Sequence, residues 1–316
     1  MELSFAPMEG ITSCIFRETH AALFGGADRY YTPFIAPDGA GRFKTGCLRD
    51  ALPENNPGIP LIPQILCNRA EPFLLAARQL GELGYEELNL NAGCPSGTVT
   101  AKHKGAGMLA DPESLDNCLA DIFSRCEQKI SVKTRLGVKT PEEFAAIAEI
   151  YRKYPLSRLI IHARTAAGKY ESIPDTSIFA GYAGSFPFPV SYNGNIFSSA
   201  DAEALHKAAP GDWGLMLGRG AVADPALFRK LRGGAALKKE ELQDFHNTLL
   251  RKFIQWGLDE RSTMARLKEL WFYWKSHFPH SEKELKALFK SRSLSDYSAA
   301  AEAVFQGEFS GDVMFT

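Results

Sequence analysis

Short, apolar, β-prone runs alternate with segments of helical spacing along most of this 316-residue chain. Eight such runs lie at residues 3–8, 29–33, 61–66, 87–91, 130–135, 158–162, 189–193 and 213–217. Helical spacing is clearest between them at residues 72–83, 111–124, 140–151 and 199–207. Eightfold alternation of strand and helix is typical of an α/β protein folded as a (β/α)8 (TIM) barrel. A doubly wound open sheet is the alternative, and the absence of G-x-G-x-x-G after the first run disfavours it.

The pattern changes after residue 230. Helical periodicity continues at residues 237–257, 261–276, 281–290 and 295–305, and no strand-like run is obvious. We therefore predict a barrel domain at residues 1–230 and a small all-α domain of about four helices at residues 231–316. The connection at residues 36–60 is rich in Gly and Pro, so we expect a long loop there.

Composition restricts the classes of function. The formal net charge is −1, from 36 basic and 37 acidic residues, so any binding of nucleic acid must depend on local basic patches. The six cysteines form no C-x-x-C pair, which argues against a zinc site, and we expect no metal. We find no secretory leader and no apolar stretch of about 18 residues, so we expect a cytoplasmic protein without a membrane partner. We also expect a monomer.

Polar residues follow nearly every predicted strand, and in a barrel these positions meet at one mouth, where chemistry takes place. They are Gln64, Asn91 with Cys94, Lys133 with Arg135, His162 with Arg164, Asn193 with Asn195, and Gly218 with Arg219. Glycine-rich turns after the last two strands predict a phosphate site, because backbone N–H groups there surround an anion and Arg219 can pair with phosphate oxygens. The alternative is that Gly194, Gly218 and Gly220 only form tight turns.

Three side chains of this group have the chemistry of a redox site. Lys133 interrupts an apolar strand, and an ammonium there can stabilise the negative charge of a reduced flavin ring, unless it simply reaches solvent. His162 can act as a base, bind flavin or phosphate, or be a core histidine. Cys94 enters a loop of Gly, Ser, Thr and Lys, where we expect it to be exposed and able to donate a proton to a carbanion; a structural cysteine is the alternative. The basic turn at residues 102–104 is either a solvated surface or a polyanion site.

Nine stretches of the sequence match one family. They are APMEGIT, PQILCN, LNLNAGCPSGTV, KGAGML, SVKTRLG, IIHARTAAGKY, YNGNI, GLMLGRGAVADPALF and ARLKELWFYW. On these stretches the chain resembles the tRNA-dihydrouridine synthases over nearly its whole length. The cysteine motif followed by KGAGM and H-x-R-T is specific, since related flavin barrels such as dihydroorotate dehydrogenases share only parts of the phosphate cradle. The N-x-G-C-P-S-x-T-V form is most similar to the DusC branch.

The resemblance implies a barrel that binds FMN, with NADPH or NADH as reductant, and a helical domain that helps to hold tRNA. It implies that the flavin contacts Pro7, Met8, Gln64, Lys133 and His162, and that its ribityl chain and phosphate contact Asn193, Asn195, Gly218 and Arg219. The implied tRNA-binding residues are Asn91 at the uracil edge, Arg164 and Tyr170 at the entry of the target nucleotide, and the basic Lys102, Lys104, Arg266 and Lys268.

The implied reaction is the reduction of a tRNA uridine to dihydrouridine, with hydride from flavin N5 to C6 and a proton from Cys94 to C5. Asn195 stands where the family usually has Asp, Gly168 where it usually has Gln, and Thr176 where Trp usually follows Asp175. These departures concern tRNA-facing details more than the flavin site. Two alternatives are a flavin barrel acting on a small molecule, which would not need the helical domain, and a non-catalytic tRNA-binding protein, which would be colourless.

Overall fold

The computed structural model describes residues 1–43 and 45–311. Within them the chain forms two compact units: the first comprises residues 1–7, 28–195 and 203–217, and the second residues 8–27, 196–202 and 218 onward. All strands belong to the first unit. They are β1 (Leu3–Phe5), β2 (Arg29–Tyr31), β3 (Leu61–Ile62), β4 (Gln64–Ile65), β5 (Glu87–Ala92), β6 (Lys129–Arg135), β7 (Arg158–His162), β8 (Val190–Asn193) and β9 (Gly214–Leu217).

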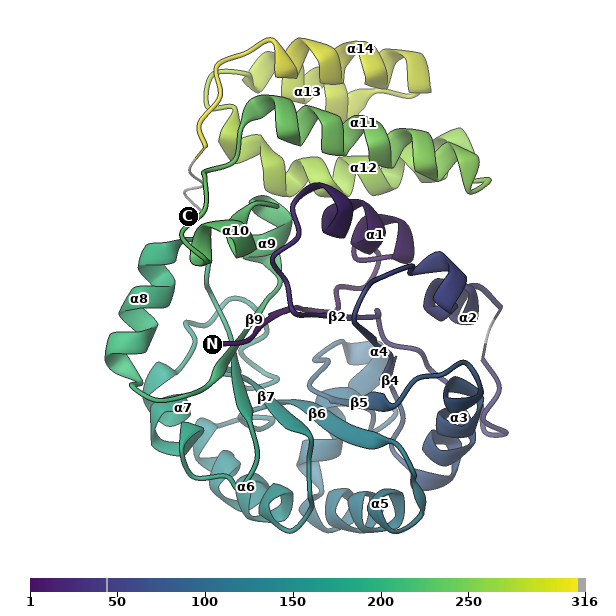
Figure 1. Cartoon of the computed structure of the whole chain (residues 1–316), viewed down its shortest axis with the longest axis vertical. Helices are drawn as coiled ribbons and strands as arrows, with labels where there is room; N and C mark the ends of the chain where they lie inside the picture. The colour runs from purple at the N-terminus through teal and green to yellow at the C-terminus, as the bar shows by residue number, and fades with distance from the viewer. Residues whose placement is uncertain (44, 312–316) are drawn as a thin grey trace. The chain divides into compact units, whose positions relative to one another are not determined.

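The strands form one parallel sheet in the order β3-β2-β1-β9-β8-β7-β6-β5-β4, drawn as the central ring of Figure 1. Pro63 divides the third predicted strand, because proline has no N–H to donate to a neighbour. Thus β3 pairs with β2 and β4 pairs with β5, while the Pro63 carbonyl accepts the Asn89 N–H at 2.9 Å. Since β3 and β4 are the two ends of the sheet and one residue apart, the sheet closes. The predicted (β/α)8 barrel is confirmed.

The strands are apolar because both faces of a barrel sheet are covered. All five residues of β7 are buried, including Leu159, Ile160 and Ile161. Side chains from several strands meet in the barrel, where Ala6, Tyr31, Ile62, Ile160 and Met216 form one buried cluster. The closed core holds the strand ends in fixed relative positions, which is what a polar site at the mouth requires.

Helices of the first unit lie outside the strands, as α3, α5 and α6 show in Figure 1. Their bounds are α2 (Thr45–Ala51), α3 (Ala70–Glu82), α4 (Gly97–Thr100), α5 (Pro112–Arg125), α6 (Phe144–Arg152), α7 (Thr176–Ala183) and the 3-10 helices η1 (Pro53–Asn55), η2 (Gly105–Ala110) and η3 (Pro141–Glu143). α8 (Ser199–Ala208) lies between β8 and β9 along the chain. Asp111 caps α5 by accepting the Ser114 N–H at 3.1 Å. The Glu143 carboxylate accepts three N–H groups of residues 138–140 at 2.7–3.0 Å, which fixes the start of α6.

The expectation of a long loop at residues 36–60 was wrong in part, since α2 and η1 lie within it. Side chains from within the segment and from outside it stabilise them. Asn56 donates to the carbonyls of Asp50 and Leu52 at 3.0 and 2.9 Å, and the Tyr85 hydroxyl donates to the Ala51 carbonyl. The number of Gly and Pro residues cannot reveal such contacts. Tyr85 in particular follows α3, more than thirty residues after the helix it stabilises.

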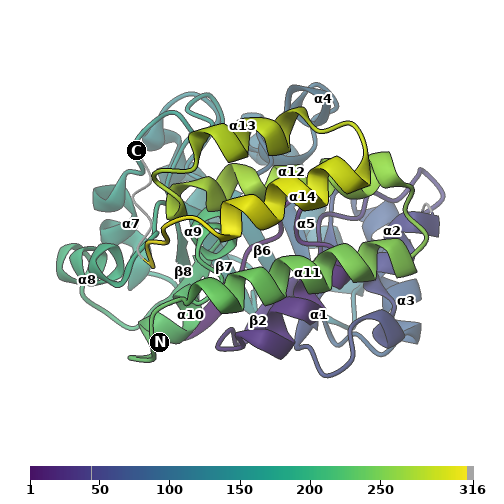
Figure 2. The same cartoon turned by 90° about the horizontal axis from the view of Figure 1, so that it is seen from above.

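The second unit is helical. It contains α1 (Cys14–Leu23), α9 (Arg219–Ala223), α10 (Leu227–Leu231), α11 (Lys239–Gln255), α12 (Glu260–Trp274), η4 (Lys275–His277), α13 (Glu282–Lys290) and α14 (Leu294–Phe305). The last four α-helices match the four predicted segments and run alongside one another (Figure 2). Tyr297 joins three of them, because its hydroxyl accepts the Trp271 N–H at 2.9 Å and lies 2.7 Å from His246 Nε2. The domain boundary at residue 230 stays a prediction. Within the described ranges, no helix is long and apolar enough to span a bilayer.

Candidate active site

A chain of buried amide groups connects β4 and β5. Gln64 Nε2 donates to Asn89 Oδ1 at 2.8 Å, and Asn91 Nδ2 donates to Gln64 Oε1 at 2.8 Å. Asn89 in turn donates to Ser131 Oγ on β6 at 2.9 Å. Each amide partners the next, so these polar groups are buried without loss of hydrogen bonds and their orientations are fixed. Asn89 was not among the predicted site residues, although its position two residues before Asn91 places it on the same face of the strand.

The amide chain ends on the loop that holds Cys94. Asn91 Oδ1 accepts the N–H of Cys94 at 2.9 Å and the N–H of Gly93 at 3.1 Å. The Cys94 carbonyl accepts the Ala106 N–H at 3.0 Å. Gly105 has φ +56°, and a Cβ there would lie 2.7 Å from the Cys94 carbonyl oxygen, so the KGAGM motif lets the chain pass close behind the cysteine. The Cys94 side chain is half-buried, where we had expected exposure.

The other cysteines differ in environment. Cys14, Cys67 and Cys118 are buried. Burial raises the pKa of the Cys67 thiol, and it raises that of Cys118 to about 12. Both therefore remain protonated and unreactive at neutral pH, as expected of structural cysteines.

Lys133 lies on β6, paired in register with Asn91 of β5. Among the described residues its ammonium has no hydrogen-bond or ion-pair partner. Burial, together with a smaller effect of the charge of Arg135, lowers the pKa of Lys133 to about 7, and the nearby Cys94 opposes the shift. Lys133 is partly buried, and a cation removed from water without a partner is unfavourable unless a ligand supplies the negative charge. The thiol and the ammonium therefore share one site, and that site fits an electron-rich or anionic ligand.

Arg135 is a buried residue of the site whose structural role the sequence did not reveal. Only 1% of it is exposed. Its Nε donates to the Gly93 carbonyl at 2.9 Å, and Nη1 donates to the carbonyls of Thr165 and Lys169 at 2.7 and 2.9 Å. One guanidinium thus ties the cysteine loop to the loop after β7. The sequence did contain a hint of this role, because Arg135 is a second basic residue, after Lys133, at the end of an apolar strand.

His162 ends β7 and is buried, with Asn193 of β8 beside it in register. Arg164, predicted at the entry of a nucleotide, is 2% exposed, and its guanidinium contacts His162, Ser172 and Asn195. Tyr170 is 56% exposed, and its ring lies 5.9 Å from the His162 ring. The structure therefore places Tyr170 at the surface of this mouth and Arg164 beneath it.

The glycines after β8 and β9 have packing roles of their own. A Cβ at Gly194 would lie 2.2 Å from the Tyr192 hydroxyl, and one at Gly220 would lie 2.0 Å from the Ile196 carbonyl oxygen. Asn193 Nδ2 donates to the Met216 carbonyl at 2.8 Å, which leaves its other N–H for a ligand. Asn195 is exposed.

Several predicted site residues lie in the second unit. Gly218 and Arg219 begin α9, and the Arg219 guanidinium lies 5.8 Å from the centre of the Phe197 ring. The turn after β1 begins with half-buried Pro7, which belongs to the first unit, and half-buried Met8, which belongs to the second. The Met8 carbonyl accepts the Thr12 N–H at 3.0 Å. On α12, Arg266 donates to the Gly10 carbonyl at 2.9 Å and Lys268 to the Ser291 carbonyl at 2.7 Å. Both basic residues of α12 are thus partly engaged within the protein.

The basic turn at residues 102–104 belongs to the cysteine loop. Lys102 is exposed and Lys104 half-buried, and Asn68 Nδ2 donates to the Lys102 carbonyl at 3.1 Å. A pocket of about 340 Å³ beside the turn is lined by Arg69 and His103, among others. The lining also includes Asp111, so both basic and acidic side chains surround this pocket.

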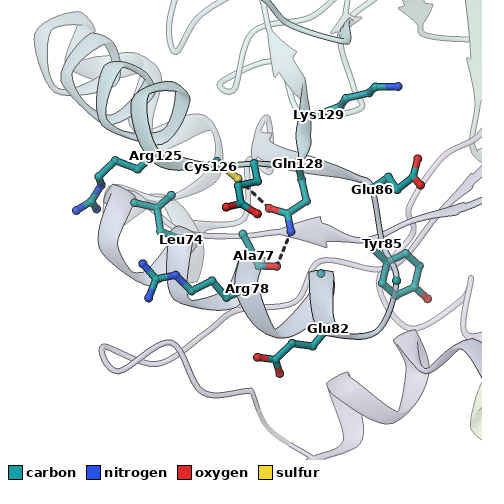
Figure 3. Close-up of a pocket in the computed structure, with 13 residues that line it drawn as sticks. Leu74, Ala77, Arg78, Glu82, Tyr85, Glu86, Arg125, Cys126, Gln128 and Lys129 are labelled. Carbon is teal, nitrogen blue, oxygen red and sulfur yellow. Dashed lines mark hydrogen bonds between the residues drawn. The ribbon is translucent and has the colours of Figure 1, made fainter.

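A groove of about 880 Å³ lies at the other end of β6 (Figure 3). In it the Cys126 thiol donates to Gln128 Oε1 at 3.2 Å, and Gln128 Nε2 donates to the Ala77 carbonyl at 3.2 Å. Lys129, the first residue of β6, lines it, so the groove lies at the amino end of the barrel. Barrel enzymes carry their chemistry at the carboxyl end, so this groove is separate from the candidate site. Within the described part of the chain, no group of three His, Cys, Asp or Glu side chains could hold a metal ion.

Comparison with known proteins connects this site to a family. The family model described as "Dihydrouridine synthase (Dus)" matches residues 4–303. The chain belongs to the dihydrouridine synthase family. Similar curated proteins of the family are the tRNA-dihydrouridine(16) synthases of Pseudomonas syringae pv. tomato (31% identical over 257 residues, 77% of each chain) and Pseudomonas putida (29% over 312 residues, 94% of each). That of Ralstonia nicotianae is 29% identical over 248 residues, 76% of each chain.

Two solved structures resemble the dihydrouridine synthase chain in fold. A variant of NCR from Zymomonas mobilis has a TM-score of 0.51 at 15% identity, with 77% of this chain and 90% of that chain covered. Histamine dehydrogenase from Rhizobium sp. 4-9 has a TM-score of 0.54 at 9% identity, with 84% and 49% covered. At these identities the likeness shows the barrel fold alone.

Proposed function

We propose that this dihydrouridine synthase binds FMN at the carboxyl ends of its barrel strands, accepts electrons from NADPH or NADH, and reduces the C5–C6 double bond of a tRNA uridine. Family membership supports the reaction. The observation that supports the cofactor is Lys133, whose partly buried ammonium lacks a partner among the described residues and has its pKa lowered to about 7. An electron-rich flavin edge would supply the missing charge.

The residues at the mouth fit this cofactor. Lys133 would face the pyrimidine edge of the flavin ring, and Gln64 and His162 would contact the same ring, as would Pro7 and Met8. We propose that the ribityl chain and phosphate contact Asn193, Asn195, Gly218 and Arg219. Arg219 offers a guanidinium, and Asn193 keeps one free amide N–H. When bound, reduced FMN supplies hydride to C6 of the uracil ring.

Cys94 completes the reduction. Hydride at C6 leaves an enolate with negative charge at C5 and O4, and the Cys94 thiol donates its proton to C5, leaving a thiolate that water reprotonates. Asn91 positions the thiol by accepting the Cys94 N–H at 2.9 Å. One N–H of the Asn91 amide goes to Gln64, and the second remains for an oxygen of uracil. Holding the thiol and the uracil ring in a fixed relative position lowers the activation barrier of the proton transfer.

The target base must leave the tRNA stack to reach this mouth, which costs a few kcal/mol. Contacts with phosphates and with the pocket would offset that cost. We propose Lys102 and Lys104 beside Cys94, Tyr170 with Arg164 beneath it, and Arg266 and Lys268 of α12 as the tRNA-binding residues. The net charge of −1 means that binding rests on such local clusters. Because six of the curated relatives carry the printed name tRNA-dihydrouridine(16) synthase, we propose uridine 16 as the target.

Mass spectrometry of tRNA from cells with and without the gene tests this proposal, with dihydrouridine mapped to position. We expect dihydrouridine at position 16 to disappear on deletion and to return on expression of the wild-type chain. Loss at a different position would contradict the choice of uridine 16 only. Unchanged dihydrouridine at every position, together with a purified protein that lacks flavin absorbance, would contradict the proposed function.

A further inference from the structure

The Arg164 guanidinium contacts three parts of the barrel mouth at once. Nε donates to the Ser172 carbonyl at 2.6 Å, and Nη2 donates to Asn195 Oδ1 at 3.0 Å. Nη1 lies 3.1 Å from His162 Nε2. Arg164 is 2% exposed, so these contacts replace its hydration and hold the group in one geometry.

The contact with His162 determines which ring nitrogen carries the proton. A guanidinium has five N–H donors and no acceptor, and it stays charged in proteins. The contact at 3.1 Å is therefore a hydrogen bond only if His162 Nε2 accepts through its lone pair. A neutral imidazole that accepts at Nε2 has its proton on Nδ1.

The other two forms of the ring do not fit this contact. With its proton on Nε2, His162 would direct an N–H at an N–H of Arg164. An imidazolium would do the same and would add repulsion between two positive charges inside the protein. Both forms leave a buried donor without an acceptor, which is unfavourable.

We propose that Arg164 is a positioning residue that keeps His162 neutral with its proton on Nδ1, so that Nδ1–H is the donor this ring offers to the bound flavin. The pairing of β7 with β8, in which His162 lies opposite Asn193, fixes the backbone position of the ring. That flavin accepts the Nδ1–H hydrogen bond rests on the proposed function. The tautomer does not, because it follows from the contact between Arg164 and His162 Nε2.

NMR of protein with ¹⁵N-labelled histidine, purified with its flavin, measures the tautomer directly. The chain has seven histidines, and the signals of His162 are assigned by their loss in His162→Gln. We expect Nδ1 of His162 to carry the proton and Nε2 to carry none. In Arg164→Met, which keeps the length of the side chain without a donor, we expect a shift towards Nε2–H and a rise of about tenfold in the FMN dissociation constant.

Two further variants separate this role from a structural one. Arg164→Lys keeps one donor and should retain Nδ1–H and most of the FMN affinity. Arg152→Met removes a guanidinium that donates to Ser185 near the surface of the same unit, and it should change neither quantity.

Wild-type protein with the His162 proton on Nε2, or with both nitrogens protonated at neutral pH, would overturn the inference. An Arg164→Met spectrum identical to wild type would do so as well. If Arg164→Met does not fold, the wild-type spectrum and Arg164→Lys still decide. A protein with the Nδ1–H tautomer that fails to reduce tRNA would count against the proposed function and leave this inference intact.

Discussion

Replacing Lys133 by methionine should stabilise the flavin-free protein and weaken flavin binding. The pKa of Lys133 lies near 7, against an ordinary value of 10.5, because burial disfavours its charged form. At about 1.4 kcal/mol per pKa unit, the difference corresponds to a destabilisation of the charged form of at most about 5 kcal/mol. Solvent reaches the mouth and screens this charge, so we expect methionine to gain about 2 kcal/mol of stability at pH 7.

The dependence on pH gives the sign of the effect. A lysine whose folded-state pKa is lowered destabilises the fold fully below pH 7, and the destabilisation disappears as the pH rises towards 10.5. The advantage of Lys133→Met over wild type should therefore be largest near pH 6.5 and smaller at pH 9.5. The FMN dissociation constant of Lys133→Met should rise about 10-fold to 100-fold, because a charged contact is lost.

Denaturant titration of flavin-free protein and fluorescence titration with FMN measure the two quantities. Lys129→Met is the matched control, since Lys129 is exposed at the amino end of the same strand and should change neither. If Lys133→Met were no more stable than wild type and bound FMN equally well, the ammonium would be neither desolvated nor directed at the cofactor.

Three other substitutions test separate parts of the site. Arg135→Met leaves two buried carbonyls and one partly buried carbonyl without their donor and should lower the free energy of unfolding by about 3 kcal/mol. Arg152→Met should lower it by less than about 1 kcal/mol, and equal effects would contradict the role of Arg135. Burial would raise the pKa of Glu143, but three backbone N–H donors outweigh it and hold the pKa below its ordinary value. Glu143→Gln should thus lower the free energy of unfolding by about 1 kcal/mol at pH 7, measured by urea titration. The difference between wild type and variant should vanish as the pH falls through the pKa of Glu143. A difference that stays the same at low pH would contradict this. Tyr170→Ala should raise the KM for tRNA about tenfold and leave the FMN affinity unchanged. Tyr170→Phe keeps the aromatic ring and should behave as wild type in steady-state assays. An unchanged KM in the alanine variant would show that Tyr170 does not contact tRNA.

The barrel was predictable because its strands are local apolar runs with clear boundaries. β7 and the four late helices lie where the periodicity predicts them, within one or two residues at most ends. Pro63 altered the count of strands without altering the fold, since the two halves of one predicted strand pair with different neighbours. α2 could not be predicted, because its carboxyl end is stabilised by side chains that lie beyond the helix, Asn56 and the more distant Tyr85.

The candidate site was predictable in part, because the side chains that follow the strands converge in any closed barrel. Cys94, Lys133 and Asn91 are brought together in this way. The role of Arg135 was not predictable, because its partners are backbone carbonyls of loops far away in the sequence. The role of Arg164 was not predictable either, because the sequence does not show that its guanidinium turns back onto His162 and reaches Asn195. Gly194 was predicted to be part of a phosphate site or to form a tight turn. The structure shows a further reason for glycine at this position, since a Cβ would collide with the Tyr192 hydroxyl.

The rate at which tRNA oxidises the reduced flavin of Cys94→Ala tests the central claim most directly. Asn91 positions the loop that carries the thiol, and Cys94→Ala leaves the proposed flavin-contacting side chains unchanged, so the variant should retain FMN and its absorbance. The account predicts a single-turnover rate lower than wild type by a factor of about 10² to 10⁴, the usual contribution of a positioned acid. A variant that holds flavin and reduces uridine at the wild-type rate would show that Cys94 is not the proton donor.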